Sequence, residues 1–134
     1  MYAGGRPHPL QEPSRRILED VEAGRIDAAT SVEVIQEILH RFTAIAQRGL
    51  GTEMARSALD LFAPVLPVTH AVMRRMPGLF GRYPKLAARD LVHVATCLEE
   101  GIDAILSPDR AFDEVREIAR IPPDDAESVA ALRS

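Results

Sequence analysis

The sequence contains no tryptophan, a single cysteine and a single lysine. Cys97 cannot close a disulfide within the chain, and no charged and apolar leader opens it, so we expect a protein of the reducing cytoplasm. Charged side chains interrupt every hydrophobic stretch before it reaches the roughly 18 to 20 residues that a membrane-spanning helix needs. The sequence therefore predicts neither a disulfide-stapled secreted scaffold nor a membrane protein.

The chain also lacks a net positive charge. Its net charge is −4, which repels a polyanion as a whole, so binding to a nucleic acid would need a local basic patch. One stretch offers such a patch, with four arginines and the only lysine: Arg74, Arg75, Arg82, Lys85 and Arg89. Arginine suits bidentate phosphate contacts, but scattered basic residues are equally typical of solvated surface, and charge alone leaves both interpretations open.

What the chain does have is the size and apolar content of one domain, with 134 residues of which 46% are hydrophobic. Apolar residues recur at helical spacing, and we expect helices over residues 10–23, 30–42, 52–62, 70–76 and 86–100, with a short one in the tail after residue 123. Short apolar segments predict strands over residues 25–29, 65–68 and 102–106. Alternation of strands with helices indicates an α/β domain with a largely parallel sheet.

Local signals mark the ends of these elements. Gly24 and Gly101 would stop the helices that precede them, because glycine readily adopts the left-handed conformation found there. Thr30 and Glu33 form the pattern of a capping box at the start of the second helix.

Two aspartates follow the last predicted strand. Asp109 comes just after residues 102–106, at the strand end where ligands bind in open parallel sheets. If residues 110–117 are helical, Asp113 lies on the same face four residues later and could reach the same ion. A capping role at a helix start explains such aspartates equally well.

Two more acids lie on predicted helices. Asp90 lies off the apolar face of its helix and forms a polar stripe with His93 and Cys97, but their spacing does not match a known zinc motif. Glu37 lies off the apolar face of the second helix, where an exposed glutamate is the default. Together, the carboxylates of the chain suit Mg²⁺ or Mn²⁺, which prefer oxygen ligands and support phosphoryl transfer.

Three segments resemble successive motifs of PIN domains, in the family's order and spacing. They are residues 30–41 (TSVEVIQEILHR), 88–96 (ARDLVHVAT) and 105–113 (ILSPDRAFD). The resemblance covers nearly the whole chain, and the acidic helix combined with the ending Ser-x-Asp-x-x-Phe-Asp is more specific than any single motif.

The resemblance implies a three-layer α/β/α sandwich about a mainly parallel sheet. It implies that Glu37, Asp90 and Asp109 are the catalytic acids that bind Mg²⁺ or Mn²⁺, with Asp113 as an accessory fourth ligand and Ser107 as a supporting residue. Basic side chains near the crevice would hold the RNA backbone, and we name Arg89, Arg82, Lys85 and Arg110 for this role. The VapC branch of the family consists of ribonuclease toxins that a VapB-like antitoxin neutralises, and homodimers are expected.

One departure from the family concerns the start of the chain. PIN domains of this type begin with a central hydrophobic strand that ends in an aspartate, followed by a segment like residues 1–10 here. We therefore expect residues 1–134 to be a single PIN-like domain that is truncated at its N-terminus, with Met1 an internal methionine.

Two alternatives stay open. A truncated PIN domain could bind antitoxin or RNA without cleaving, since the first aspartate is absent. A phosphoacceptor receiver domain is another α/β fold with acids at strand ends, but it needs a lysine after a late strand, and Lys85 precedes the helix of Asp90 instead.

Overall fold

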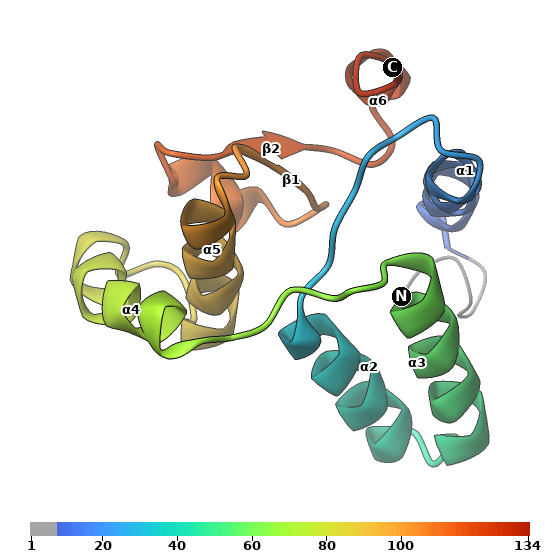
Figure 1. Ribbon diagram of the computed structural model, residues 1–134, viewed down its shortest axis with the longest axis horizontal. Helices are drawn as coiled ribbons and strands as arrows, with labels where there is room; N and C mark the ends of the chain where they lie inside the picture. Colours follow the sequence, from blue (N-terminus) through green and yellow to red (C-terminus); the bar gives the residue numbers. More distant parts are fainter. Residues whose placement is uncertain (1–7) are drawn as a thin grey trace. The chain divides into compact units, whose positions relative to one another are not determined.

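The computed structural model describes residues 8–134, most of which are helical (Figure 1). In chain order the elements are α1 (Gln11–Glu22), α2 (Val32–Ala44), α3 (Arg48–Leu61), α4 (His70–Arg82), α5 (Ala88–Glu100), β1 (Ala104–Leu106), the 3₁₀ helix η2 (Arg110–Glu114), β2 (Ala119–Ile121) and α6 (Ala126–Ala130). The chain divides into two compact units, one made of Met1–Leu66 with Pro123–Ser134 and the other of Pro67–Pro122. The segment of residues 1–10 that resembles the start of PIN domains lies mostly outside the described residues.

The first unit is built on α1 and on the helical hairpin of α2 and α3 (Figure 1). Ile38 and Phe42 of α2 pack against Ala55 of α3, as the apolar spacing of the second predicted helix indicates. Gly51 lets the two helices approach closely, because a Cβ atom there would lie 2.7 Å from Cβ of Phe42. α1 ends as predicted, before Gly24 at a φ of +76°.

Two of the predicted strands are wrong. Residues 25–29 make only one antiparallel bridge, between Ile26 and Arg133, and residues 65–68 make only one parallel bridge, between Leu66 and Ser31. The prolines at 64 and 67 have no N–H to donate, so the backbone around Leu66 cannot extend a ladder.

The predicted capping box is wrong as well. Ser31 is the N-cap residue of α2, and no side chain caps the helix. The backbone is held by Leu66 instead: its N–H donates to the carbonyl of Thr30 at 2.8 Å, and its carbonyl accepts from the N–H of Val32 at 2.9 Å. A contact distant in sequence therefore replaces the local cap.

The second unit packs α4 and α5 beside a small sheet (Figure 1). Its core contains the fully buried Leu91, Val94 and Ala95 of α5, together with the following buried residues of α4, of η2 and of the loops: Val72, Leu79, Tyr83, Leu86, Phe112, Val115 and Ile118. α5 ends at Gly101 with a φ of +70°, as predicted. α4 is longer than predicted, because Pro77 lies inside it without ending it.

The sheet consists of β1 and β2, which run parallel with Ala104, Ile105 and Leu106 beside Ala119, Arg120 and Ile121. The parallel direction was predicted, whereas β2 was not. A sandwich with a larger parallel sheet was expected, but in the part of the chain that the structure describes the sheet has two strands. Among residues 8–134, no helix is both long and apolar enough to cross a bilayer.

Candidate functional site

Asp109 lies just beyond the carboxyl end of β1, where the sequence predicts it. The backbone N–H of Ser107 continues the sheet by donating to the carbonyl of Ile121 at 3.2 Å. Ser107 Oγ accepts from the N–H of Asp109 at 3.1 Å, and Asp109 Oδ1 accepts from the N–H of Ala111 at 2.9 Å. Asp109 is therefore the N-cap of η2, which is the capping role that the sequence analysis offered beside a ligand role. Its side chain is exposed to solvent.

Asp113 is paired with an arginine. Arg120 Nε donates to Asp113 Oδ1 at 2.9 Å, and Arg120 Nη2 donates to Oδ2 at 3.4 Å. This hydrogen bonding holds the pKa of Asp113 below its ordinary value, against a smaller opposing effect of burial. The condition under which Asp109 and Asp113 would share a helix face is not met, because residues 110–114 form a 3₁₀ helix with about three residues per turn, in which positions four apart do not share a face.

Asp90 lies in the first turn of α5, half-buried, with His93 one turn later on the same helix. Both residues take part in polar interactions, so neither is without a partner. Burial raises the pKa of the Cys97 thiol, which disfavours the thiolate that a zinc site would require.

Glu37 lies on α2, half-buried and also engaged in a polar interaction. It belongs to the unit Met1–Leu66, whereas Asp90 and Asp109 belong to the unit Pro67–Pro122. Among the described residues, no three side chains of His, Cys, Asp or Glu form a group that could hold a metal ion. The predicted ligands are oxygen donors, which fit a hard cation in their chemistry.

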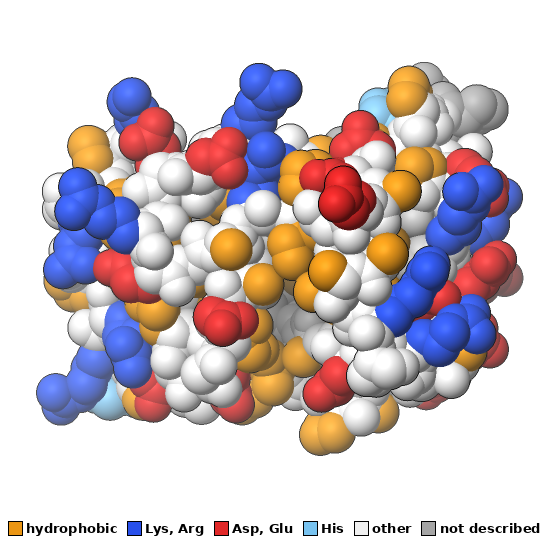
Figure 2. Space-filling view, turned by 90° about the horizontal axis from the view of Figure 1, so that it is seen from above, with side chains coloured by type: hydrophobic (Ala, Val, Ile, Leu, Met, Phe, Trp, Pro, Cys, Tyr) orange, Lys and Arg blue, Asp and Glu red, His pale blue; other side chains and the backbone are white. Residues whose placement is uncertain are grey.

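The basic residues predicted to contact RNA differ in their surroundings. Arg82 Nη1 lies 2.6 Å from Glu117 Oε1, and Lys85 Nζ lies 3.8 Å from Glu114 Oε1. Arg89 and Arg110 are exposed. On the face seen in Figure 2, blue and red side chains are interleaved, so positive charge is not gathered there into one continuous patch.

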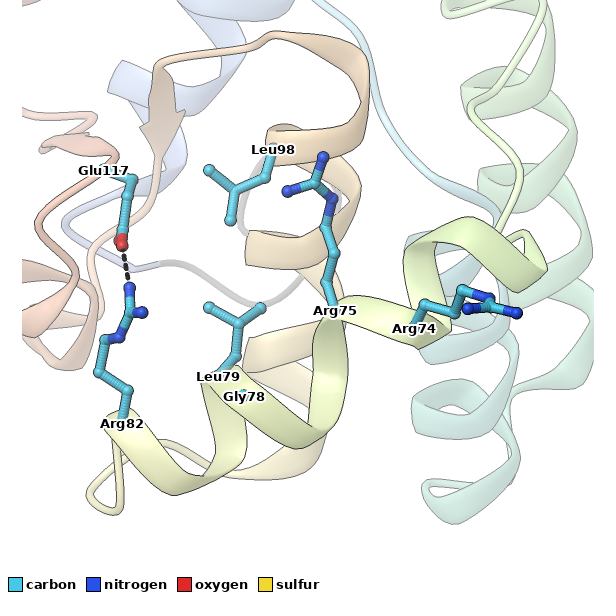
Figure 3. Close-up of a pocket in the computed structure, with 7 residues that line it drawn as sticks. All are labelled: Arg74, Arg75, Gly78, Leu79, Arg82, Leu98 and Glu117. Carbon is cyan, nitrogen blue, oxygen red and sulfur yellow. Dashed lines mark hydrogen bonds and ion pairs between the residues drawn. The ribbon is translucent and has the colours of Figure 1, made fainter.

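Arg82 also borders a groove of about 400 Å³ in the second unit (Figure 3). Its lining residues are Arg74, Arg75, Gly78, Leu79, Arg82, Leu98 and Glu117. Arg75 pairs with Glu99 at 2.8 Å, and Figure 3 shows Arg74 pointing away from the other two arginines. Acids thus neutralise two of the three arginines of this groove.

Glu117, the acid that lines this groove, is tied to a buried tyrosine. The hydroxyl of Tyr83 donates to Glu117 Oε2 at 2.7 Å, and this bond is the main reason why the pKa of Glu117 is lowered. The same hydroxyl accepts from the N–H of Arg116 at 3.3 Å.

Arg120 is a residue of this region that the sequence analysis did not single out. A lone arginine in a segment not predicted to be a strand has no spacing signal. Its position beside Ile105 in the sheet is what brings it to Asp113 and to Ser107.

Comparisons with known proteins identify the family of this chain. The PIN domain family model matches residues 1–118. The VapC ribonuclease Mb1869c of Mycobacterium bovis is 32% identical over 121 residues, which cover 90% of this chain and 92% of that protein. Ribonuclease VapC7 of Mycobacterium tuberculosis is 32% identical over 133 residues, covering 98% and 92%, and VapC23 of the same species is 34% identical over 112 residues, covering 84% and 88%.

No solved structure matches the chain. The family model spans both compact units, and each of these relatives is matched over most of its own length. The chain therefore belongs to the PIN-domain family, in its VapC ribonuclease branch.

Proposed function

We propose that this chain is a metal-dependent endoribonuclease toxin that hydrolyses RNA phosphodiester bonds. Membership of the VapC branch supports this function, and one structural observation carries it: Asp109 is held beyond the carboxyl end of a parallel strand, where ligands bind in such sheets. The family's α/β class further supports the proposal that residues 1–134 belong to one PIN-like domain with a three-layer sandwich.

In this proposal Glu37, Asp90 and Asp109 are the catalytic acids and would hold Mg²⁺ or Mn²⁺. A bound divalent cation supplies a water of lowered pKa and stabilises charge on the leaving oxygen. The role of the protein is to fix the positions of the carboxylates. Ser107 Oγ accepts from the backbone N–H of Asp109, and the N–H of Ala111 donates to Asp109 Oδ1. Asp113, the accessory fourth acid of the family resemblance, would bind an ion with oxygens that already accept hydrogen bonds from Arg120.

RNA contacts and partners are part of the same proposal. We assign the RNA backbone to Arg89, Arg82, Lys85 and Arg110, because these basic side chains are exposed on the unit that carries Asp90 and Asp109. Arg82 and Lys85 are held by ion pairs that are open to solvent, and such pairs are weak enough for a phosphate to displace. A VapB-like antitoxin as the inhibitor and a homodimer as the assembly are proposed from family membership.

The experiment is cleavage of a mixed cellular RNA pool by the purified chain with and without Mn²⁺. Asp90→Asn and Asp109→Asn are the test variants, and Asp60→Asn, an exposed position on α3, is the matched control. Cleavage that needs Mn²⁺ and both tested acids supports the nuclease. Equal cleavage by all variants would show a contaminating enzyme and refute the assignment.

A third outcome separates the nuclease from a protein that only binds. If the chain retains RNA in a gel-shift assay but does not cut it at any Mn²⁺ concentration, it is a non-catalytic PIN domain. An antitoxin peptide that binds the silent chain would lead to the same conclusion.

A further inference from the structure

We propose that Arg120 is a positioning residue for Asp109, and that Asp113 contributes to the site by holding Arg120 rather than by binding a metal ion. The part of this inference that concerns catalysis rests on the proposed nuclease function. The part that concerns the geometry of Asp109 stands without it.

The guanidinium of Arg120 makes three hydrogen bonds with two acceptor groups. Nε and Nη2 donate to the two carboxylate oxygens of Asp113, at 2.9 and 3.4 Å. Nη1 donates to the backbone carbonyl of Ser107 at 3.1 Å. The planar fork of arginine matches this arrangement, whereas the single ammonium of a lysine could not satisfy both acceptor groups in the same way.

Burial of the arginine distinguishes this ion pair from others of the second unit, while the Asp113 side chain is 55% exposed. The side chain of Arg120 is only 12% exposed, compared with 43% for Arg75 and 62% for Arg82 in their pairs with glutamates. Exposed pairs contribute little, but a buried guanidinium is costly unless it is fully paired. Asp113 is therefore the counter-ion that allows Arg120 to lie inside the protein beside β1.

The bond from Arg120 to Ser107 fixes the turn that carries Asp109. Ser107 is held at three points: its N–H by Ile121, its carbonyl by Arg120 and its Oγ by the N–H of Asp109. Pro108, the middle residue of the turn, has no N–H that could secure it. The orientation of Asp109 thus depends on a chain of contacts from Asp113 through Arg120 and Ser107.

This geometry also bears on the role of Asp113. A cation bound to Asp113 would share the carboxylate with the guanidinium of Arg120 and bring a second positive charge close to it, which weakens the charge-assisted hydrogen bonds of Arg120. Asp113 is therefore less suited to bind a cation than an acid without a cationic partner, and its carboxylate matters through the arginine that it anchors.

The test compares Arg120→Met, Arg120→Lys, Asp113→Asn and the double variant Arg120→Met with Asp113→Asn. Arg116→Met is the matched control, because Arg116 is an exposed arginine of the same unit outside this network. The first readout is amide hydrogen exchange of the metal-free protein at Ala111 and Asp109, whose N–H groups are held by Asp109 Oδ1 and Ser107 Oγ. The second is a titration with Mn²⁺ alone, and the third is the kinetics of RNA cleavage.

We expect Arg120→Met and Asp113→Asn to speed exchange at both amides and to lower kcat by about 10- to 100-fold, the usual effect of losing a residue that orients a metal ligand. KM for RNA stays unchanged, since neither residue is assigned to the RNA. The double variant is no worse than either single one, because both changes break one network. Arg120→Lys recovers part of the loss.

Two results would overturn the proposal. Unchanged exchange at Ala111 and Asp109 in Arg120→Met shows that Arg120 does not hold the turn, whether or not the chain cuts RNA. Weaker Mn²⁺ binding in Asp113→Asn, with normal binding in Arg120→Met, makes Asp113 a direct ligand. If Arg120→Met does not fold, hydrogen exchange in Arg120→Lys and Asp113→Asn decides. Exchange at the amides of Asp109 and Ala111 that is as slow as in the wild type refutes the proposal, and faster exchange at both supports it.

Discussion

Asp20 of α1 is joined to Arg133, which lies 113 positions later in the chain. Arg133 donates to Asp20 Oδ2 through Nε at 2.8 Å and through Nη2 at 2.7 Å, while Arg25 Nε donates to Oδ1 at 2.7 Å. The side chain of Asp20 is only 5% exposed. One arginine five residues away and one 113 residues away therefore neutralise the buried carboxylate, and the second ties the C-terminal segment to α1 within the first unit.

Replacing Arg133 should destabilise the protein more than replacing an arginine in an exposed pair. Arg133→Met leaves Asp20 with Arg25 alone, and a buried carboxylate that loses a partner is costly. Arg16→Met is the control, because the side chain of Arg16 is 71% exposed in its pair with Glu12. Thermal unfolding measures both. Equal shifts of Tm in the two variants would contradict the role assigned to Arg133.

The same carboxylate predicts a pH dependence of stability. Hydrogen bonds from Arg25 and then Arg133 hold the pKa of Asp20 below its ordinary value of 3.8 in the folded protein. The folded state therefore binds fewer protons, and the stabilisation is present above about pH 4 and lost as pH falls through the lowered pKa. We expect the difference in unfolding free energy between wild type and Asp20→Asn to shrink below pH 4. A difference that grows on acidification would show the opposite sign of linkage.

Two glycines of α3 should respond in opposite directions to the same change. In Gly51→Ala the new Cβ would lie 2.7 Å from Cβ of Phe42, and overpacking of about 1–3 kcal/mol outweighs the better helix propensity of alanine. Nothing lies within 4 Å of a Cβ at Gly49, so Gly49→Ala should stabilise by up to about 1 kcal/mol. Urea unfolding compares them. A stabilised Gly51→Ala would mean that α2 and α3 are not packed as closely as described.

The core of the second unit should depend on α5. Leu91 is fully buried, and Leu91→Ala should cost about 2–5 kcal/mol through lost burial and a residual cavity. Met73→Ala on α4 is the control, because Met73 is 46% exposed and should change stability by less than about 0.5 kcal/mol. Equilibrium unfolding in urea gives both values. Similar effects of the two changes would mean that Leu91 does not belong to a packed core.

Local signals in the sequence located the helices well. The apolar period places α1, α2 and α5 within about two residues of their observed bounds, since a helix satisfies its backbone within itself. Gly24 and Gly101 end α1 and α5 because the left-handed conformation there is a property of single residues. Asp109 likewise follows its strand as predicted, because a strand end and a cap are both local features.

Long-range contacts were what the sequence could not supply. Residues 25–29 and 65–68 have strand-like composition but make single bridges, and β2, which has an arginine at its centre, makes a full pairing. A strand exists only where another backbone accepts its hydrogen bonds, and composition does not name that backbone. For the same reason the role of Arg120 could not be predicted, because its three hydrogen bonds are made with residues 7 and 13 positions away.

The sequence by itself determined the family, the helices and the identity of the candidate acids, because motif order and period are written along the chain. Only the tertiary structure decided that Asp113 is held by Arg120 and that Asp20 is shared by Arg25 and Arg133. The physical reason is that a carboxylate has the same chemistry in every sequence, while its role depends on which donor folding brings within hydrogen-bond distance.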